Sequence, residues 1–344
     1  MDTLSVPAQR LRTMLRTAMG EGVAEALANP AVFEIMVNPD GVVRLDLAGE
    51  GRLDTGAIMT AADVERVIRL VASHVNAEVH SDNPIVSAEL PLGPDGTGGE
   101  RFEGLLPPVV SAPCFSIRKP AYRLLTLDTY VANAVMTQAQ AGLLRRSVRH
   151  RDNILVVGGT SSGKTTLTNA LLAEVADLDE RVILIEDTRE LRCAARDVVA
   201  LRTRIGFVTM ADLVRSTLRL RPDRIIVGEV RGAEALDMLK AWNTGHPGGI
   251  ATLHANSARG ALLRLEQLIQ EAVVHVPRPL IAEAIDVIVF ICGANAHTGA
   301  PRQVGEIMAL NGLDRDGNYE LRSALPAGED YLSLPSIPRR PECA

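Results

Sequence analysis

The most constraining stretch of the sequence is Asn153–Leu172, which reads NILVVGGTSSGKTTLTNALL. Ile154 to Val157 form a short apolar run without helical spacing, which is typical of a buried parallel strand. Residues 158–165 then fit G-x-x-x-x-G-K-[ST], the pattern of a phosphate-binding loop. From Thr165 onward the apolar residues return at helical spacing, so strand, loop and helix follow in the required order. The sequence therefore predicts a site for a nucleoside triphosphate.

Each residue type in this loop has a chemical reason. Glycines allow positive φ and a close approach of the backbone, so that successive N–H groups can point at phosphate oxygens. We expect Lys164 to reach the β- and γ-phosphates and the Thr165 hydroxyl to take one Mg²⁺ position, above a helix N-terminus with partial positive charge. The predicted cofactors are ATP and Mg²⁺. The loop residues predicted to bind them are Gly158, Gly159, Thr160, Ser161, Ser162, Gly163, Lys164, Thr165 and Thr166.

Acidic residues follow two further apolar runs. A magnesium nucleotide needs a carboxylate near the metal, usually an Asp that ends a strand. Here the run 224–227 is followed by Gly228, in the place of that Asp, and then by Glu229. The run 182–185 is followed by Glu186 and Asp187. Both strands should deliver their acids to the C-terminal edge of a parallel sheet, so we take Glu229 and Glu186 as catalytic candidates and Thr165 with Glu229 as metal ligands.

For Asp187 a role as a cap of the following turn is an equal alternative. Two histidines are further candidates. His246 lies in a Gly/Pro-rich loop, and His254 ends the apolar run 249–254. They could ligate a metal, but no third ligand accompanies them at a suitable spacing. A structural role is the simpler interpretation for a lone histidine, whereas a histidine at a strand end beside a γ-phosphate could bond to it and respond to its loss.

Composition favours a soluble globular protein and argues against a nucleic-acid role. Hydrophobic residues make up 47% and charged residues 23%, the ordinary balance for such a protein. With a net charge of −6 the chain has no overall basic footprint, and with 3% aromatic residues it has few side chains on which bases could stack. The 4 cysteines match no metal or redox spacing. With no signal peptide or apolar run of membrane-spanning length apparent, we expect a cytoplasmic protein. The basic amphipathic helix expected at 6–20 either packs on its own domain or contacts a membrane surface or a partner.

The 344 residues divide by pattern into two domains. Residues 1–120 alternate short strands, at 32–37, 42–47, 85–90 and 104–110, with a helix that Asp63 is placed to cap, which indicates an α+β domain. Residues 121–150 are expected to be a linker, with a short helical segment at 126–131 and an arginine-rich helix at 139–148. From 151 to 320, apolar runs at 154–157, 182–185, 225–227, 249–254, 285–291 and 304–310 alternate with helical segments, which predicts an α/β sheet covered on both faces. Residues 321–344 are expected to be a flexible tail.

Four ordered motifs give the chain a resemblance to a known family. They are GGTSSGKTT, IEDTREL, LRLRPDRIIVGEVRG and NTGHPGGIATLHANS. In this order and spacing they resemble the secretion-ATPase superfamily, and most closely the traffic ATPases of type IV secretion and conjugal DNA transfer, of the Trb type. Residues 99–119 also resemble that branch, so the likeness spans about residues 30–310. A type II secretion or pilus-type motor is the nearest alternative within the superfamily.

The resemblance implies a RecA-like P-loop NTPase domain that works in a hexameric ring. It places Glu186 in an acidic box and His254 in a histidine box. It also implies that a glycine in the place of the usual aspartate, such as Gly228 before Glu229, is normal in this family. Arg101 and Arg118 match arginines that approach the nucleotide from the N-terminal domain. Arg221 and Arg231 flank the second motif, and which arginine acts across a subunit boundary stays open.

One departure from the family pattern is Ser161, where relatives usually have glycine, so the loop geometry there is in question.

The function implied is Mg-dependent ATP hydrolysis by a hexameric motor that energises conjugal DNA transfer, type IV secretion or assembly of its pilus. The implied partners are further copies of the chain, inner-membrane channel proteins and coupling proteins, with peripheral contact at the inner membrane and without sequence-specific nucleic-acid binding. One alternative is a nucleotide-gated assembly factor with slow hydrolysis. Another is a nucleic-acid translocase, which the acidic balance and the scarcity of aromatic residues disfavour.

Overall fold

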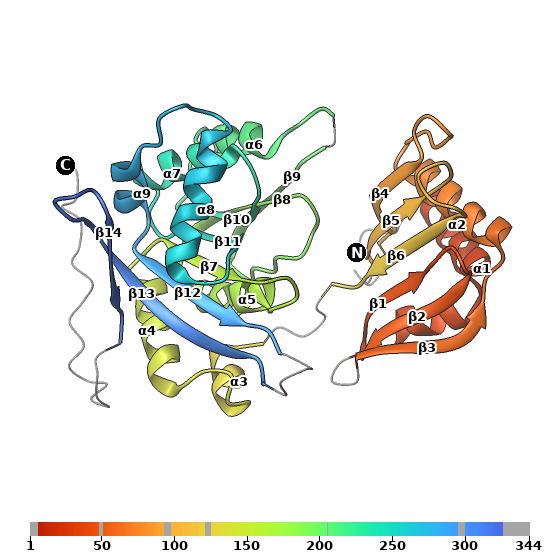
Figure 1. The fold of residues 1–344 in the computed structure, drawn as a ribbon, viewed down its shortest axis with the longest axis horizontal. Helices are drawn as coiled ribbons and strands as arrows, with labels where there is room; N and C mark the ends of the chain where they lie inside the picture. The colour runs from red at the N-terminus through yellow and green to blue at the C-terminus, as the bar shows by residue number, and fades with distance from the viewer. Residues whose placement is uncertain are drawn as a thin grey trace. The chain divides into compact units, whose positions relative to one another are not determined.

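The computed structural model describes residues 6–47, 51–92, 98–120, 125–204, 206–294 and 300–325. The chain divides into two compact units, Met1–Tyr122 and Arg123–Ala344. Each unit contains its own sheet and its own hydrophobic core (Figure 1).

The first unit is a six-stranded sheet with helices on one face. The strands lie in the order β3-β2-β1-β6-β5-β4, and every neighbouring pair is antiparallel. Side chains from both helices and from alternate strand positions, among them Leu15, Val67, Ile35 and Phe102, form its core. The elements in chain order are α1 (Val6–Ala28), β1 (Val32–Val37), β2 (Val42–Leu47), β3 (Gly51–Ile58), α2 (Ala61–His74), β4 (Ile85–Glu89), β5 (Arg101–Leu105) and β6 (Cys114–Arg118).

Two local predictions for this unit need correction, and a third is confirmed with a second helix added after it. The strand expected at 104–110 lies earlier, as β5, because the chain beyond it passes through two consecutive prolines that donate no ladder hydrogen bond. The N-cap of α2 is Thr60, whose hydroxyl accepts the Asp63 N–H at 3.2 Å, and Asp63 is the third helical residue. The helix expected at 6–20 forms the first part of α1; it is interrupted at Gly20, which has a non-helical conformation, and a second helix continues to Ala28.

The second unit is built on an eight-stranded sheet in the order β14-β13-β12-β7-β11-β10-β8-β9. The six strands from β12 to β9 run parallel, whereas β13 and β14 are antiparallel to their neighbours. The elements in chain order are α3 (Leu127–Ala132), α4 (Gln138–Arg149), β7 (Ile154–Gly158), α5 (Lys164–Val175), β8 (Arg181–Glu186), β9 (Asp197–Arg202), α6 (Met210–Thr217), β10 (Arg224–Val230), α7 (Glu234–Asn243), β11 (Ile250–His254), α8 (Ala258–Gln270), α9 (Arg278–Ala284), β12 (Val287–Cys292), β13 (Gln303–Leu313) and β14 (Tyr319–Ser323).

Hydrophobic cores cover both faces of this sheet, as the continuous apolar strands predict. Successive side chains of β7 point to opposite faces, with Leu155 and Val157 in one core and Ile154 and Val156 in the other. Helices α6 to α9 contribute to the first of these cores and α3 to α5 to the second. Figure 1 shows the helices on the two sides of the strands. The α/β prediction for this part of the chain is confirmed.

The two helices expected within the linker segment, 121–150, are present as α3 and α4, and both belong to the second unit. Tyr130 of α3 and Leu144 of α4 are buried in its core. Both helices have threonine N-caps, Thr126 and Thr137, and these hydroxyls, which accept backbone N–H groups, supply the start signals. Of the expected tail, residues 321–323 belong to β14 and residues 326–344 lie outside the described part of the chain. Among the described residues, every helix is too short or too polar to cross a membrane.

Candidate nucleotide-binding site

Four adjacent strands bring most of the predicted site to one edge of the second sheet. Strand β7 ends in the phosphate loop, and its last residue, Gly158, pairs with His254 at the end of β11. The next strand, β10, carries Glu229, and β8 beyond it ends at Glu186. Because these strands are parallel, all four carry their polar residues at the same, C-terminal edge. Loop, histidine and both acids are therefore brought together as predicted.

The phosphate loop lies between β7 and α5 in a conformation that depends on two glycines. A Cβ on Gly158 would lie 2.5 Å from both the Ile291 carbonyl oxygen and the Ser162 hydroxyl. Gly163 has φ +99° and precedes the first residue of α5 without a capping side chain. The first N–H groups of α5 therefore remain directed toward the loop, which is the arrangement that binds phosphate at helix N-termini.

Ser161, the departure from the family pattern, has φ +58° and lies in the left-handed region. A residue with a Cβ costs about 1–2 kcal/mol in this conformation, whereas glycine adopts it readily. The Ser161 side chain is exposed. The loop therefore keeps the shape that glycine allows and carries a local backbone strain in doing so.

Lys164 is buried, with 7% of its surface exposed, and its ammonium contacts two loop carbonyls and one histidine ring. It donates to the carbonyl oxygens of Gly158 at 3.1 Å and Gly159 at 2.9 Å. The two ring nitrogens of His254 lie 3.3 and 3.4 Å from the same ammonium. The lysine is thus held within the loop, next to the histidine that ends the neighbouring strand.

Glu229 connects His254 to an arginine. Its Oε1 lies 2.7 Å from His254 Nε2, and its Oε2 pairs with the guanidinium of Arg231. Burial lowers the pKa of His254, and the nearby positive charge of Lys164 lowers it further, against the opposing effect of Glu229. His254 is therefore favoured in its neutral form at neutral pH. Arg231 also approaches the Asp187 carboxylate at 3.5 Å, and Asp187 accepts the Thr203 hydroxyl at 2.8 Å.

Glu186 is buried and orders the chain that follows β8. Its Oε1 accepts the backbone N–H groups of Glu190 at 2.9 Å and Leu191 at 2.7 Å. A Cβ on Gly228 would lie 3.0 Å from Glu186 Cγ. The buried glutamate therefore leaves little room for a side chain at position 228, which explains physically why glycine stands in the place of the usual aspartate.

The residues fit a magnesium nucleotide. The loop offers the uncapped start of α5 and Lys164, together with the Thr165 and Thr166 side chains, which are partly exposed in the first turn. The Ser162 hydroxyl is buried and has no hydrogen-bond partner in the described part of the chain. Among the described residues no group of three His, Cys, Asp or Glu could hold a metal by itself. Mg²⁺ bound to a nucleotide needs only one or two protein ligands, because phosphate and water supply the others.

Other predicted residues lie elsewhere. Arg221 precedes β10, at the opposite edge of the sheet from the phosphate loop, and is exposed with φ +53°. His246 lies in the loop between α7 and β11, where its Nδ1 is 3.3 Å from the Ala241 carbonyl oxygen, so the structure does not pair it with His254.

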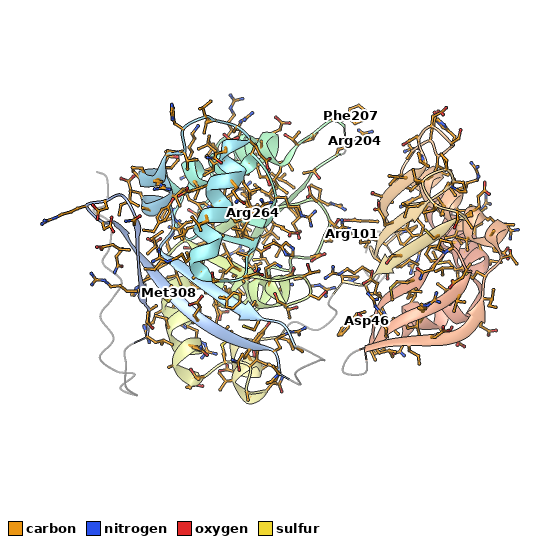
Figure 2. The ribbon with its side chains drawn as sticks, viewed as in Figure 1. Asp46, Arg101, Arg204, Phe207, Arg264 and Met308 are labelled. Atoms are coloured by element: carbon orange, nitrogen blue, oxygen red, sulfur yellow. The ribbon has the colours of Figure 1, made fainter. Side chains whose placement is uncertain are left out.

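Arg101 and Arg118 belong to the first unit, where they are direct neighbours on β5 and β6 (Arg101 is labelled in Figure 2). Opposite residues of paired strands share one face of a sheet. Glu34 on β1 pairs with Arg118, and Glu89 on β4 pairs with Arg101. The two arginines therefore stand side by side within a row of four charged residues, with an acid at each end.

Sequence patterns did not single out Arg302. Its guanidinium Nη2 donates to the Ser161 carbonyl oxygen at 3.2 Å, across 141 positions of the chain. The one available signal was its basic character near a predicted strand. Thr252 was also missed: it is buried on β11 and its hydroxyl donates to the Gly228 carbonyl oxygen at 2.6 Å.

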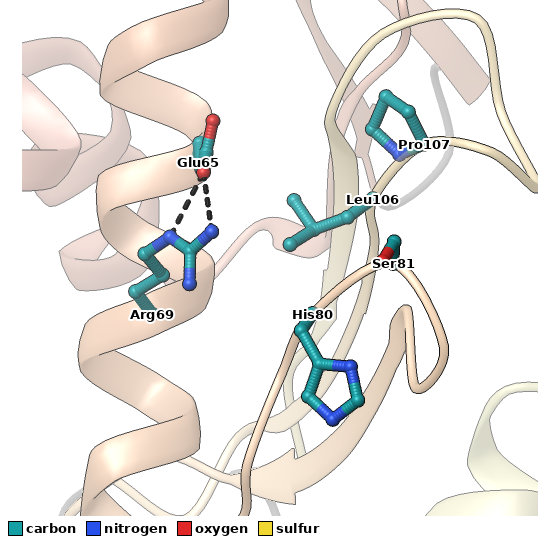
Figure 3. Close-up of a pocket in the computed structure, with 6 residues that line it drawn as sticks. All are labelled: Glu65, Arg69, His80, Ser81, Leu106 and Pro107. Carbon is teal, nitrogen blue, oxygen red and sulfur yellow. Dashed lines mark hydrogen bonds and ion pairs between the residues drawn. The ribbon is translucent and has the colours of Figure 1, made fainter.

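A separate hollow lies in the first unit, between α2 and two loops (Figure 3). Arg69 on its wall is engaged by Glu65 at 2.7 Å and donates to the Val79 carbonyl oxygen at 3.1 Å. None of the residues predicted to bind nucleotide lines it. It is therefore distinct from the phosphate-loop site. The lining residues are Glu65, Arg69, His80, Ser81, Leu106 and Pro107.

Known proteins are similar to this chain in sequence. Residues 101–304 match the family described as type II/IV secretion system protein. The chain is 47% identical over 323 residues to a conjugal transfer protein TrbB of Rhizobium radiobacter, covering 93% of this chain and 96% of that protein. It is 30% identical over 293 residues to the type IV secretion system protein VirB11 of Bartonella quintana, covering 73% of this chain and 80% of that one.

Two solved structures have a similar fold. The pilus retraction motor PilT with bound ADP aligns with a TM-score of 0.60 at 20% identity, covering 89% of this chain and 83% of that one. The ATPase DotB of Legionella pneumophila aligns with a TM-score of 0.57 at 19% identity, covering 90% and 83%. At these identities the likeness concerns the fold.

Proposed function

The chain belongs to the type II/IV secretion system protein family as a traffic ATPase of type IV secretion and conjugation, and we propose that it hydrolyses Mg-ATP to energise conjugal DNA transfer, type IV secretion or assembly of its pilus. One observation carries the proposal: the phosphate loop, His254, Glu229 and Glu186 meet at one edge of four adjacent parallel strands. A binding switch requires fewer polar groups around the loop than this.

Each group has a role in the proposed reaction. Lys164 binds the β- and γ-phosphates, exchanging its bonds to the loop carbonyls for phosphate oxygens. Thr165 and Glu229 are the expected magnesium ligands, and bound Mg²⁺ supplies neutralisation of charge on the phosphate chain. Glu229 also orients the attacking water and accepts its proton. His254, between Lys164 and Glu229, hydrogen-bonds the terminal phosphate. Glu186, packed against Gly228, fixes the backbone beside Glu229.

The proposal includes a RecA-like domain acting in a ring of six subunits. Arg101 and Arg118, paired on one face of the first unit, would approach the phosphates from that unit. Arg221 is separated from the phosphate-loop edge by the length of β10, about 20 Å for a strand of its size, so we assign its nucleotide contact to a neighbouring subunit. The expected partners are inner-membrane channel and coupling proteins, at the cytoplasmic side of that membrane.

The test measures ATP turnover per subunit against protein concentration, with mass by light scattering on the same samples. We expect turnover to rise as a species of about six subunits forms. Lys164→Ala should abolish turnover, and Glu229→Gln should lower kcat by about 100-fold or more while ATP binding is kept. Lys240→Ala and Glu320→Gln, both outside the site, serve as matched controls.

Two outcomes would count against the proposal. Turnover that survives in Glu229→Gln would remove the assigned role of Glu229. Turnover per subunit that is independent of concentration, from a monomer, would remove the ring and favour the nucleotide-gated assembly factor. Turnover stimulated by DNA, with a stimulation that salt abolishes, would instead favour a translocase.

A further inference from the structure

Arg302, just before β13, lies against the phosphate loop of the same unit. Its Nη2 donates to the Ser161 carbonyl oxygen at 3.2 Å. Its Nε, Cδ and Cζ lie 3.3–3.5 Å from the position that a Cβ on Gly163 would take. The Arg302 side chain therefore bonds to Ser161 and lies beside Gly163, the two loop residues that have positive φ, at +58° and +99°.

The backbone near Arg302 is well anchored. Two residues further on, the Val304 N–H donates to the Val135 carbonyl oxygen at 2.7 Å, and the Val304 carbonyl accepts the Gln140 side-chain amide at 3.2 Å. Val304 also pairs with Ile291 on β12. Gln140 is itself fixed by the capping box at the start of α4. The arginine thus projects from a rigid base, which is the requirement for a side chain that positions another group.

Arg302 bonds to the loop at Ser161, the residue whose backbone conformation is strained. A serine in the left-handed region is disfavoured relative to right-handed or extended backbone, because its Cβ crowds the backbone there. A charge-assisted hydrogen bond to its carbonyl oxygen favours the left-handed conformation and offsets part of this strain. Without the bond, the Ser161 peptide should spend more time in other conformations, in which the N–H groups that follow it no longer converge.

We propose that Arg302 is a positioning residue for nucleotide: it holds the Ser161 turn of the phosphate loop in the conformation that receives phosphate. This inference rests on the proposed function, because it assumes that the loop binds a nucleotide. Arg302 acts through the loop backbone, and its effect should therefore depend on which residue occupies position 161.

The test compares Arg302→Ala, Ser161→Gly and the double variant. The measurements are the Kd for MgADP by calorimetry, together with kcat and KM for ATP. Arg302→Ala should raise the Kd and KM by about tenfold with kcat changed less than threefold, as loss of one charge-assisted hydrogen bond predicts. In the Arg302→Ala background, Ser161→Gly should recover most of the affinity, because glycine adopts positive φ without strain. Arg322→Ala on β14 is the matched control for removal of an exposed arginine.

Several results would overturn the inference. An unchanged Kd in Arg302→Ala would do so, and so would a loss of affinity that Arg302→Lys restores and Ser161→Gly does not, since that pattern indicates a direct effect of charge. Equal melting temperatures of the ligand-free variants show that folding is intact. The proposed function fails separately: tight MgADP binding without turnover in the wild type refutes the motor and leaves the role of Arg302 measurable by Kd.

Discussion

Replacing Gly228 by aspartate, the usual residue at that place in phosphate-loop proteins, should destabilise the second unit by about 4–5 kcal/mol. A Cβ there would lie 3.0 Å from Glu186 Cγ. Glu186 cannot retreat freely, because its Oε1 accepts two backbone N–H groups at 2.9 and 2.7 Å. Weakening these bonds should cost about 1–2 kcal/mol. Two carboxylates about 5 Å apart repel by a further 3 kcal/mol or so, at an effective dielectric constant of about 20.

The fluorescence of Trp242 can be used to follow the unfolding of this unit. Trp242 is the single tryptophan of the chain, and its indole N–H donates to the Ile225 carbonyl oxygen on β10 at 3.1 Å. Urea unfolding followed by its fluorescence therefore reports on the strand that carries the substitution. Gly228→Ala isolates the steric part, about 1–2 kcal/mol. Gly142→Ala in α4, where a Cβ would meet its nearest atom at 3.7 Å, is the control and should be neutral or stabilising by about 0.5–1 kcal/mol.

A second substitution separates charge from size. Adding Glu186→Gln to Gly228→Asp removes the repulsion but keeps the crowding, so it should recover about 3 kcal/mol. The reasoning is refuted if Gly228→Asp unfolds at the urea concentration of the wild type. It is also refuted if Glu186→Gln leaves the free energy of unfolding of Gly228→Asp unchanged, because the buried carboxylate would then not be the cause of the loss.

Two further predictions concern the opposite edge of the sheet. Burial, with a smaller contribution from the charge of Asp286, raises the pKa of Asp152 from 3.8 to about 6. Because the folded state binds this proton more tightly, the stabilisation is present below pH 4 and is lost as pH rises to about 6. Asp152→Asn should therefore raise the free energy of unfolding in urea at pH 8, by about 1–2 kcal/mol after screening at this partly exposed site, and leave it unchanged at pH 4. Arg224 is fully buried and donates to the carbonyls of Val148 at 2.7 Å and Gly248 at 3.2 Å. Arg224→Met should cost about 3–5 kcal/mol and lower Tm by roughly 10 °C in a thermal melt; a shift below about 2 °C would contradict this.

The central strands and the phosphate loop were predictable because their signals are local. The run 154–157 became β7, and the helix expected from Thr165 begins one residue earlier, at Lys164. Such strands are buried on both faces, so nearly every residue must be apolar. The edge strands β3 and β9 carry no comparable signal, since β3 is exposed along its whole length and β9 is partly exposed. They form through backbone pairing with a neighbouring strand, and hydrophobic periodicity does not record that pairing.

The site residues likewise include some that local sequence signals predict and others that depend on contacts between distant segments. The placement of Glu186, Glu229 and His254 was predictable because each lies at or near the end of an apolar strand, and the C-terminal ends of parallel strands share one edge. Lys164 was predictable from the phosphate-loop pattern. Arg302 was not predictable, because its contact with Ser161 depends on the order β13-β12-β7, which brings distant segments together. The position of Gly228 could be read from the sequence, but its cause required the packing of Glu186 against it.

The contacts at the site form one continuous row from the phosphate loop to Asp187. Lys164 lies beside His254, His254 lies 2.7 Å from Glu229, and Arg231 joins Glu229 to Asp187. Each charged group in the row therefore already has a partner within one chain. Under the proposed function, binding of ATP is an exchange of partners: as Lys164 turns to phosphate, the positive charge beside His254 moves away and the contact between His254 and Glu229 is altered. If His254 binds the terminal phosphate as proposed, it does so while in contact with the residue proposed to activate water, which would give the strand-end histidine a physical reason for its place.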